Sequence, residues 1–276
     1  MMDFAAPALF ALFSWWFATG IILWLDGLPA RTHRWTLMGS TLILIGSGVA
    51  LYQLRGATDV TAIYLSFLAV LGIWAWNETT FLLGVLTGPV QRPCPEGAVG
   101  MERFRAALDS VLYHEAGLIL SGVAIAIITW GDTQHFALHL FALLWALRLS
   151  TKLNLFFGVP HAPGHFLPEQ LRYLATYFRE RPVSGLFALT VTLATIAAVL
   201  LCAAAGQTAD GSAARAAASF LAAFAVLGVI EHWFLACPIG ADHLWRWALH
   251  SHVKTAAQSL PVLPTPALSK VKGAES

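Results

Sequence analysis

Seven long apolar runs constrain this chain more than any other feature of its sequence. A helix that crosses a membrane needs about 20 mainly apolar residues. Hydrophobic residues make up 58% of the chain and charged residues only 11%, whereas a soluble domain carries about 25% charged residues. The sequence therefore predicts an all-α fold, a polytopic transmembrane helix bundle of about seven spans. The predicted spans cover residues 8–26, 35–54, 61–86, 111–130, 133–150, 183–205 and 216–237.

The segments outside the spans predict a single domain with a disordered tail. No internal repeat or second domain is visible, so residues 1–258 are expected to form one transmembrane helical domain. A short surface helix is predicted at residues 101–109, and interfacial helices at 167–181 and 241–253, where apolar and basic residues fall on different faces. Residues 259–276 are rich in proline and are predicted to be a disordered cytoplasmic tail.

The distribution of basic residues predicts the orientation in the membrane. Of the 16 Lys and Arg residues, only Arg55 and Arg215 fall on the side opposite to the rest. Cytoplasmic loops carry an excess of Lys and Arg, so the N-terminus is predicted to be periplasmic and the C-terminus cytoplasmic. The net charge of +1 argues against a nucleic-acid partner, because nucleic-acid-binding domains are usually strongly basic. The expected partner is the lipid bilayer.

Three of the predicted spans contain ionisable residues at a similar depth. These residues occur as adjacent pairs, at Asn77-Glu78, His114-Glu115 and Glu231-His232. Charge inside a membrane costs several kcal/mol unless it is paired or hydrated, so such residues are usually functional. The direction of each span and the rise of 1.5 Å per residue place all three pairs in the cytoplasmic part of the membrane. We therefore expect the pairs to meet at one site.

The chemistry of these side chains suits a metal centre. Carboxylates and imidazoles together bind iron, manganese or zinc, so the sequence predicts metal ligation by Glu78, His114, Glu115, Glu231 and His232. Di-iron bundles use Glu-x-x-His motifs, whereas the residues of each pair here are adjacent and point about 100° apart on a helix. One member of each pair would then bind the metal and the other would support it. The alternatives are a buried proton or pigment-binding network, and hydrogen bonding that only fixes helix packing.

Further polar residues lie at the same inner edge. Arg148 and Lys152 are spaced i, i+4 and form a basic pair, and Asn154 follows one turn later. Such a pair binds lipid headgroups or another anionic ligand, for example a propionate. His165 lies in the proline-rich loop that follows and is placed to cap the polar residues from the cytoplasmic side.

Several further motifs are spread along the chain. They are Trp74-Ala75-Trp76-Asn77-Glu78, Thr87-Gly88-Pro89, Pro93-Cys94-Pro95 with Gly97, His114-Glu115, residues 147–160 and residues 227–234. Together these motifs resemble the photosynthetic complex assembly protein 2 family (PuhE) of phototrophic bacteria, and the similarity covers nearly all of the chain up to about Trp247. The resemblance implies a multi-pass protein of the bacterial inner (cytoplasmic or intracytoplasmic) membrane. It implies no established catalytic residues.

Two functions remain open at this point. The resemblance implies an assembly factor for the photosynthetic reaction centre and light-harvesting complex, or for bacteriochlorophyll supply. Its partners would be photosynthetic complex subunits or pigment-synthesis enzymes, and its cofactor a bacteriochlorophyll or another tetrapyrrole. The alternative is an intramembrane metal-dependent oxidoreductase, with iron or another divalent metal, acting on a tetrapyrrole or lipid. Metal content and co-purified pigment discriminate between the two.

Overall fold

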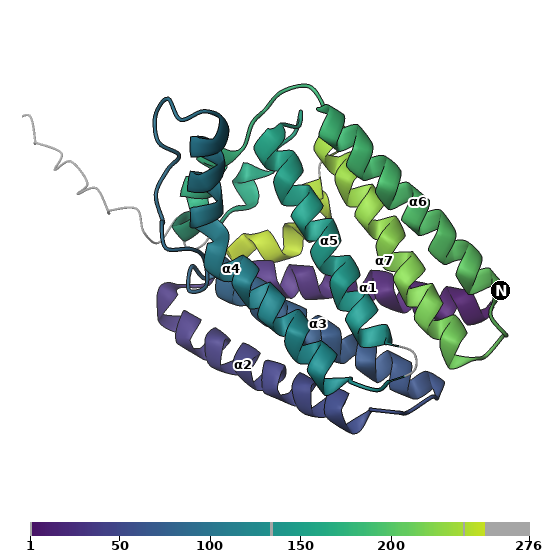
Figure 1. The fold of residues 1–276 in the computed structure, drawn as a ribbon. Helices are drawn as coiled ribbons and strands as arrows, with labels where there is room; N and C mark the ends of the chain where they lie inside the picture. The colour runs from purple at the N-terminus through teal and green to yellow at the C-terminus, as the bar shows by residue number, and fades with distance from the viewer. Residues whose placement is uncertain (1, 133–134, 240, 252–276) are drawn as a thin grey trace, which may run out of the picture.

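The structure is a computed structural model that describes residues 2–132, 135–239 and 241–251. Within these residues it is all-helical, and seven of its helices are long and apolar enough to cross a membrane (Figure 1). The predicted fold class is thereby confirmed, and the orientation of the termini stays a prediction. The seven helices are α1 (Met2–Asp26), α2 (Ala30–Gln53), α3 (Val60–Leu82), α4 (Gly100–Ile128), α5 (Phe136–Phe157), α6 (Gly185–Gln207) and α7 (Ala213–Ala236).

Three of the helices begin at a side chain that caps their free backbone amides. Asp59 accepts a hydrogen bond of 3.0 Å from the amide of Ala62 at the start of α3. Ser184 and Ser212 do the same at the starts of α6 and α7. Ser and Asp are preferred at this position because their side-chain oxygens satisfy amides that have no partner within the helix.

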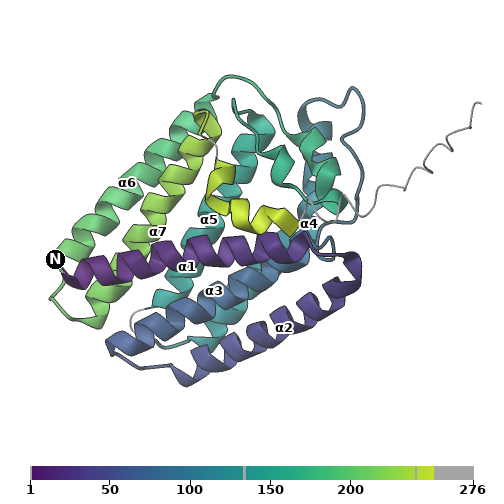
Figure 2. The same ribbon diagram turned by 180° about the vertical axis from the view of Figure 1, so that it is seen from behind.

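α5 lies at the centre of the bundle. It contacts α3, α4, α6 and α7, while α6 pairs along α7 and α2 pairs along α3. From behind, α1 is seen to cross in front of α3 and α7 (Figure 2). The core between these helices is mainly aliphatic but contains several phenylalanines, and the rings of Phe67 and Phe220 stack with their centroids 4.3 Å apart. Such ring pairs contribute more than their buried area alone.

Several helix boundaries differ from the sequence prediction. α1 and α2 begin earlier, at Met2 and Ala30, and α5 continues to Phe157 rather than ending at residue 150. The predicted surface helix at 101–109 and the predicted span from 111 form one helix, α4, because no Gly or Pro separates them. α3 ends at Leu82 rather than at residue 86, since Gly84 adopts a left-handed conformation with φ of 76°. Glycine tolerates this conformation and commonly ends a helix there.

The first predicted interfacial helix is a 3-10 helix that folds onto the bundle. This element, η2 (Glu169–Tyr177), buries Leu171, Leu174 and Tyr177 against Phe81 of α3. It follows a single 3-10 turn, η1 (Gly164–Phe166). The apolar positions of the predicted face are thus largely correct, and the helix type is not.

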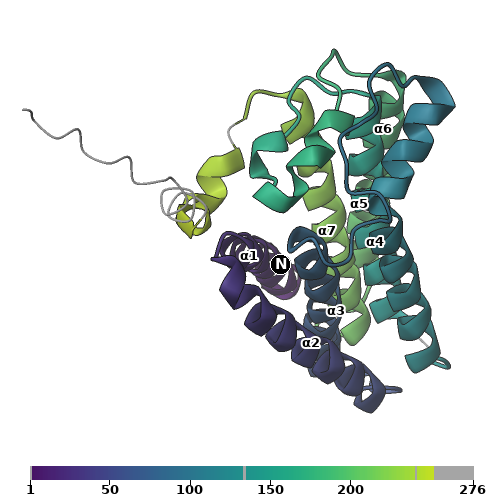
Figure 3. The same cartoon turned by 90° about the vertical axis from the view of Figure 1, so that its left-hand side faces the viewer.

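The second predicted interfacial helix begins as a 3-10 helix, η3 (Ala241–Trp245), and continues as helix to Ser251. It lies beside α1 (Figure 3). The Trp245 indole donates a 2.9 Å hydrogen bond to the carbonyl of Trp16, and the Trp16 indole donates one of 2.8 Å to the carbonyl of Leu244. Residues 252 and 253 and the predicted tail, 259–276, lie outside the described residues.

The Thr87-Gly88 motif packs directly on the backbone of α4. The amide of His114 donates a 2.9 Å hydrogen bond to the carbonyl of Thr87, and the amide of Val90 donates one to the carbonyl of Asp109. A Cβ atom on Gly88 would overlap the backbone of Asp109 and the residue after it. Only glycine therefore allows the loop to approach α4 this closely.

We expect Gly88→Ala to destabilise the protein by about 1–3 kcal/mol, because the added methyl must push the loop away from α4. Thermal unfolding of the purified protein in detergent measures the effect. Gly39→Ala is the matched control, since a Cβ atom there meets nothing within 4 Å. Equal melting of Gly88→Ala and the wild type would contradict the close approach.

Candidate functional site

A cavity of about 570 Å³ opens between α1, α3, α4, α5 and α7, near the end of the bundle where α5 stops. Its volume lies in the range of ligand sites, about 300–1,000 Å³. Most of its wall is aromatic or aliphatic, including Trp15, Trp74, Phe81, Phe104 and Trp245. The charged residues of its wall come from four different helices. They are Glu78 of α3, Glu115 of α4, Glu231 of α7, and Arg148 and Lys152 of α5.

Glu115 and Lys152 form a fully partnered pair. The Lys152 ammonium lies 2.6 Å from Oε1 of Glu115. The second carboxylate oxygen accepts a 3.2 Å hydrogen bond from the indole of Trp145. Trp145, Arg148 and Lys152 are spaced i, i+3, i+7 and so share one face of α5.

Glu78 and Arg148 form a partly satisfied pair. A guanidinium nitrogen of Arg148 lies 3.1 Å from Oε2 of Glu78. Glu78 is buried, and its other oxygen, Oε1, has no hydrogen-bond partner among the described residues. The Arg148 side chain keeps 40% of its surface uncovered by protein atoms, and it lines the cavity.

Glu231 has an indole partner and no cation bonded to it among the described residues. Its Oε1 accepts a 3.0 Å hydrogen bond from the indole of Trp15. Arg148 interacts electrostatically with Glu231 as well as with Glu78, but it donates its hydrogen bond to Glu78. The cavity thus holds three acids and two cations.

His232 lies outside this cavity wall, in the packing between α5 and α7. Its Nε2 is 2.7 Å from the hydroxyl of Ser150, and its Nδ1 is 2.7 Å from the carbonyl of Gly228. The ring is fully buried. Both nitrogens are therefore engaged within the bundle, and Glu231 alone of the adjacent pair faces the cavity.

His114 is fully buried, and neither of its ring nitrogens has a hydrogen-bond partner among the described residues. Its ring lies against Phe81, with the centroids 4.3 Å apart. Phe81 lines the cavity and His114 does not. The Lys152 ammonium lies 5.6 Å from the centre of the same Phe81 ring. Phe81 thus separates the imidazole from the charged wall.

The remaining predicted site residues are Asn154, His165 and the basic pair of Arg148 and Lys152. Asn154 is fully buried and donates hydrogen bonds to the carbonyl of Ser150 and to the hydroxyl of Thr190, so it joins α5 to α6. The side chain of His165 lies outside the described part of the structure. Arg148 and Lys152, predicted to bind an anionic ligand, are instead bonded to carboxylates of this chain.

The structure brings Glu78, Glu115 and Glu231 to one cavity and separates them from both histidines. Among the described residues, no group of three or more His, Cys, Asp or Glu side chains is placed to hold a metal ion. Two of the three acids are bonded to cations, and no hydrogen bond between described residues joins any two of the five predicted ligands. A metal centre built from Glu78, His114, Glu115, Glu231 and His232 stays a prediction.

Arg103 stabilises the wall at one end of the cavity through hydrogen bonds. This buried side chain donates hydrogen bonds to the carbonyls of Phe156 and Tyr177, and its guanidinium lies 4.1 Å from the centre of the Phe156 ring. Both residues line the cavity. Burial raises the pKa of the Tyr177 phenol, which stays protonated and donates to the carbonyl of Arg92. Arg103 thus joins α4, α5 and η2 around the cavity.

Sequence reasoning missed the indole donors of the site. Tryptophans near the ends of the predicted spans, Trp15 among them, fit an aromatic belt at the membrane surface, yet the indole of Trp15 bonds Glu231. Trp145 and Phe81 were not singled out, although both contact the charged pairs. The shared face of Trp145, Arg148 and Lys152 on α5 is the sequence signal that points to Trp145.

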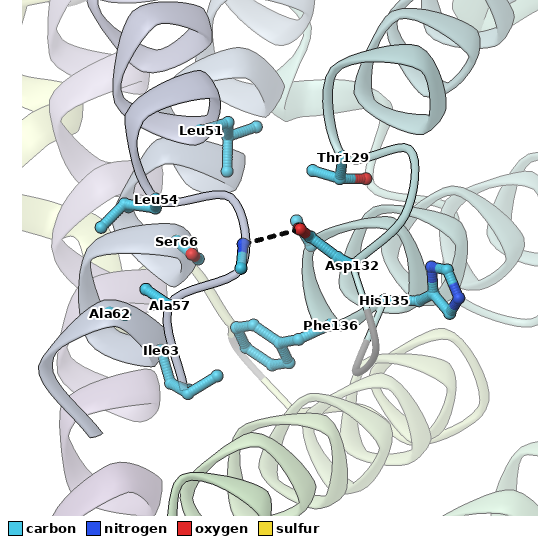
Figure 4. Close-up of a pocket in the computed structure, with 12 residues that line it drawn as sticks. Leu51, Leu54, Ala57, Ala62, Ile63, Ser66, Thr129, Asp132, His135 and Phe136 are labelled. Atoms are coloured by element: carbon cyan, nitrogen blue, oxygen red, sulfur yellow. Dashed lines mark hydrogen bonds between the residues drawn. The ribbon is translucent and has the colours of Figure 1, made fainter. Parts of the chain in front are cut away.

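A second, much smaller pocket lies at the opposite end of the bundle. It holds about 30 Å³, room for a water molecule or two. Asp132 accepts a 2.9 Å hydrogen bond from the amide of Gly56 there, and His135 points away from this bond (Figure 4). His135 is the residue before the first turn of α5, and the centroid of its ring lies 6.2 Å from that of His139. This pocket is too small for an organic ligand.

Comparisons with known proteins place the chain in a family without an assigned function. A family model described as "Protein of unknown function (DUF3623)" matches residues 1–256. A Rhodobacter capsulatus protein, described as an uncharacterized 30.4 kDa protein in the puhA 5' region, is 36% identical over 265 residues, which cover 92% of this chain and 95% of the relative. No solved structure matches the chain.

We expect Lys152→Met to destabilise the protein by about 2–3 kcal/mol. The substitution leaves the Glu115 carboxylate without its cation, and breaking a fully buried pair costs about 3–5 kcal/mol. The double variant Lys152→Met/Glu115→Gln should recover most of the loss, because it removes both charges. Thermal unfolding of the wild type, Lys152→Met, Glu115→Gln and the double variant gives a double-mutant cycle, which measures the coupling between the two side chains. Strictly additive effects would contradict the pairing.

Proposed function

The chain belongs to the family described as "Protein of unknown function (DUF3623)", and we propose that it is a membrane assembly factor for the photosynthetic apparatus. One observation carries the molecular part of the proposal: a cavity of about 570 Å³ with an apolar wall and a charged end, inside a multi-pass helix bundle. The relative in the puhA 5' region supports the photosynthetic setting. The protein holds a membrane-soluble ligand in this cavity while a complex is assembled.

The motif resemblance supports a finer assignment. It favours a role like that of the photosynthetic complex assembly protein 2 family (PuhE), in assembly of the reaction centre and light-harvesting complex or in bacteriochlorophyll supply. The ligand of the cavity is then a bacteriochlorophyll or a related tetrapyrrole, and the partners are complex subunits or pigment-synthesis enzymes. This role places the protein in the bacterial inner (cytoplasmic or intracytoplasmic) membrane, with its basic loops toward the cytoplasm.

The charged wall of the cavity favours binding over catalysis. Glu115 is bonded on both oxygens, by Lys152 and by Trp145. A catalytic acid or base must be able to reach a proton of the substrate, and this carboxylate is already occupied. These two contacts hold α4 against α5, and the Glu78–Arg148 pair holds α3 against α5. A preformed ligand site requires helices that are fixed in this way.

Deletion of the gene in a phototrophic host should lower the content of assembled photosynthetic complexes. The absorption bands of the reaction centre and light-harvesting complex in membranes measure this. Wild-type protein should restore the bands. An Ala75→Phe variant should restore them less well, because Ala75 lines the cavity and is only half-buried, so a phenyl ring there would take up cavity volume. Gly39→Phe, on an open position of α2, is the control. Normal bands in the deletion strain would refute the assembly role.

Metal analysis tests the alternative of a metal-dependent oxidoreductase. We expect purified protein to contain less than one iron per chain, because Glu78 and Glu115 are each bonded to a cation of α5. One or two irons per chain that are lost in Glu115→Ala would instead support the enzyme. Glu96→Ala, an exposed acid of the loop before α4, is the control for nonspecific metal uptake.

A further inference from the structure

The charges of the cavity do not balance. Its wall carries three carboxylates and two cations, and each cation is bonded to one carboxylate, Lys152 to Glu115 and Arg148 to Glu78. Glu231 is left with a neutral indole. In an apolar, membrane-embedded cavity an unpaired carboxylate is costly, so a positive centre brought by a ligand would be stabilised there.

Two carboxylate oxygens are free to receive such a centre. Oε1 of Glu78 is buried and has no hydrogen-bond partner among the described residues. The one hydrogen bond that the described residues give the Glu231 side chain goes to Oε1, which leaves Oε2 available. Both residues line the cavity, and the two carboxylates interact electrostatically with each other and with Arg148. The Arg148 guanidinium therefore stabilises both Glu78 and Glu231. A second positive centre near Glu231 would relieve their repulsion.

We propose that Glu231, through its free oxygen and with Glu78 beside it, selects cavity ligands that carry a positive centre on an apolar body. The apolar wall around Trp15, Trp74 and Trp245 contacts the body, and the carboxylates contact the positive centre. Two sources share this chemistry: the ammonium group of a membrane amphiphile, and a magnesium ion held in a flat macrocycle, since magnesium prefers oxygen ligands. The inference rests on the proposed function, which makes the cavity a ligand site.

Binding of two matched pairs of probes to purified full-length protein tests the proposal. The first pair is octadecylamine and octadecanol, which differ in the ammonium group. The second pair is a magnesium-containing chlorophyllide and its metal-free pheophorbide. Quenching of tryptophan fluorescence reports binding, because Trp15, Trp74 and Trp245 line the cavity. We expect wild-type protein to prefer the member that carries the ammonium group or the magnesium ion, in one of the two pairs, by about 30-fold or more, the effect of a buried charge pair.

Glu231→Gln should abolish that preference. The amide keeps the shape of the side chain and can still accept the hydrogen bond of Trp15, so the fold is retained, as equal melting temperatures would verify. Glu96→Gln, an exposed acid outside the cavity, should leave the preference unchanged. The pair that shows the preference identifies the source of the positive centre.

Three results would overturn the inference. Equal binding of both members in both pairs would refute the selection by charge and leave the ligand cavity in place. A preference that survives in Glu231→Gln would assign the selection to another group. No binding of any probe would refute the ligand cavity itself, and with it the molecular part of the proposed function.

Discussion

The cost of charge inside a membrane governs the arrangement of this bundle. α5 carries Arg148 and Lys152, and the helices around it carry the acids that those cations require. Each ion pair therefore joins α5 to a different neighbour, Arg148 to α3 and Lys152 to α4. Because polar groups without partners are expensive in hydrocarbon, the two pairs fix which faces of these helices meet. The cavity lies between the helices that these ion pairs join.

The backbone supports the same arrangement from outside the charged region. Gly88 lets the loop after α3 lie on α4, and that loop accepts the backbone hydrogen bond of His114. Arg103 joins α4 to the last turn of α5 and to η2. Both contacts hold α4 against its neighbours beside the cavity. The position of Glu115 on α4 thus depends on glycine packing and on a buried arginine, as well as on Lys152.

Apolar run length was enough to predict the seven spans, since a membrane requires it of any spanning helix. Depth along the helices was enough to predict that Glu78, Glu115 and Glu231 lie at one level. The hydrogen-bond or ion-pair partner of each side chain could not be predicted from the sequence, because it depends on the rotation of each helix about its axis. That rotation turns His232 toward Ser150 and leaves Glu231 facing the cavity. The 3-10 form of η2 was missed because its apolar spacing also suits an α-helix.

The cavity wall carries three acids and only two cations, and this difference distinguishes a binding site from a network that only fixes helix packing. In a network that only fixes packing, every polar atom can find its partner within the protein. Glu115 is an example, with a cation bonded to one oxygen and an indole bonded to the other. Glu78 has one oxygen without a partner among the described residues, and Glu231 has an indole partner but no bonded cation there. Both residues lie on the wall of the cavity of about 570 Å³. Since an unpaired carboxylate in an apolar site gains most from a positive partner, the missing charge describes the ligand. The fold provides an apolar cavity with one acid more than its cations, and the positive centre of the ligand would balance that acid.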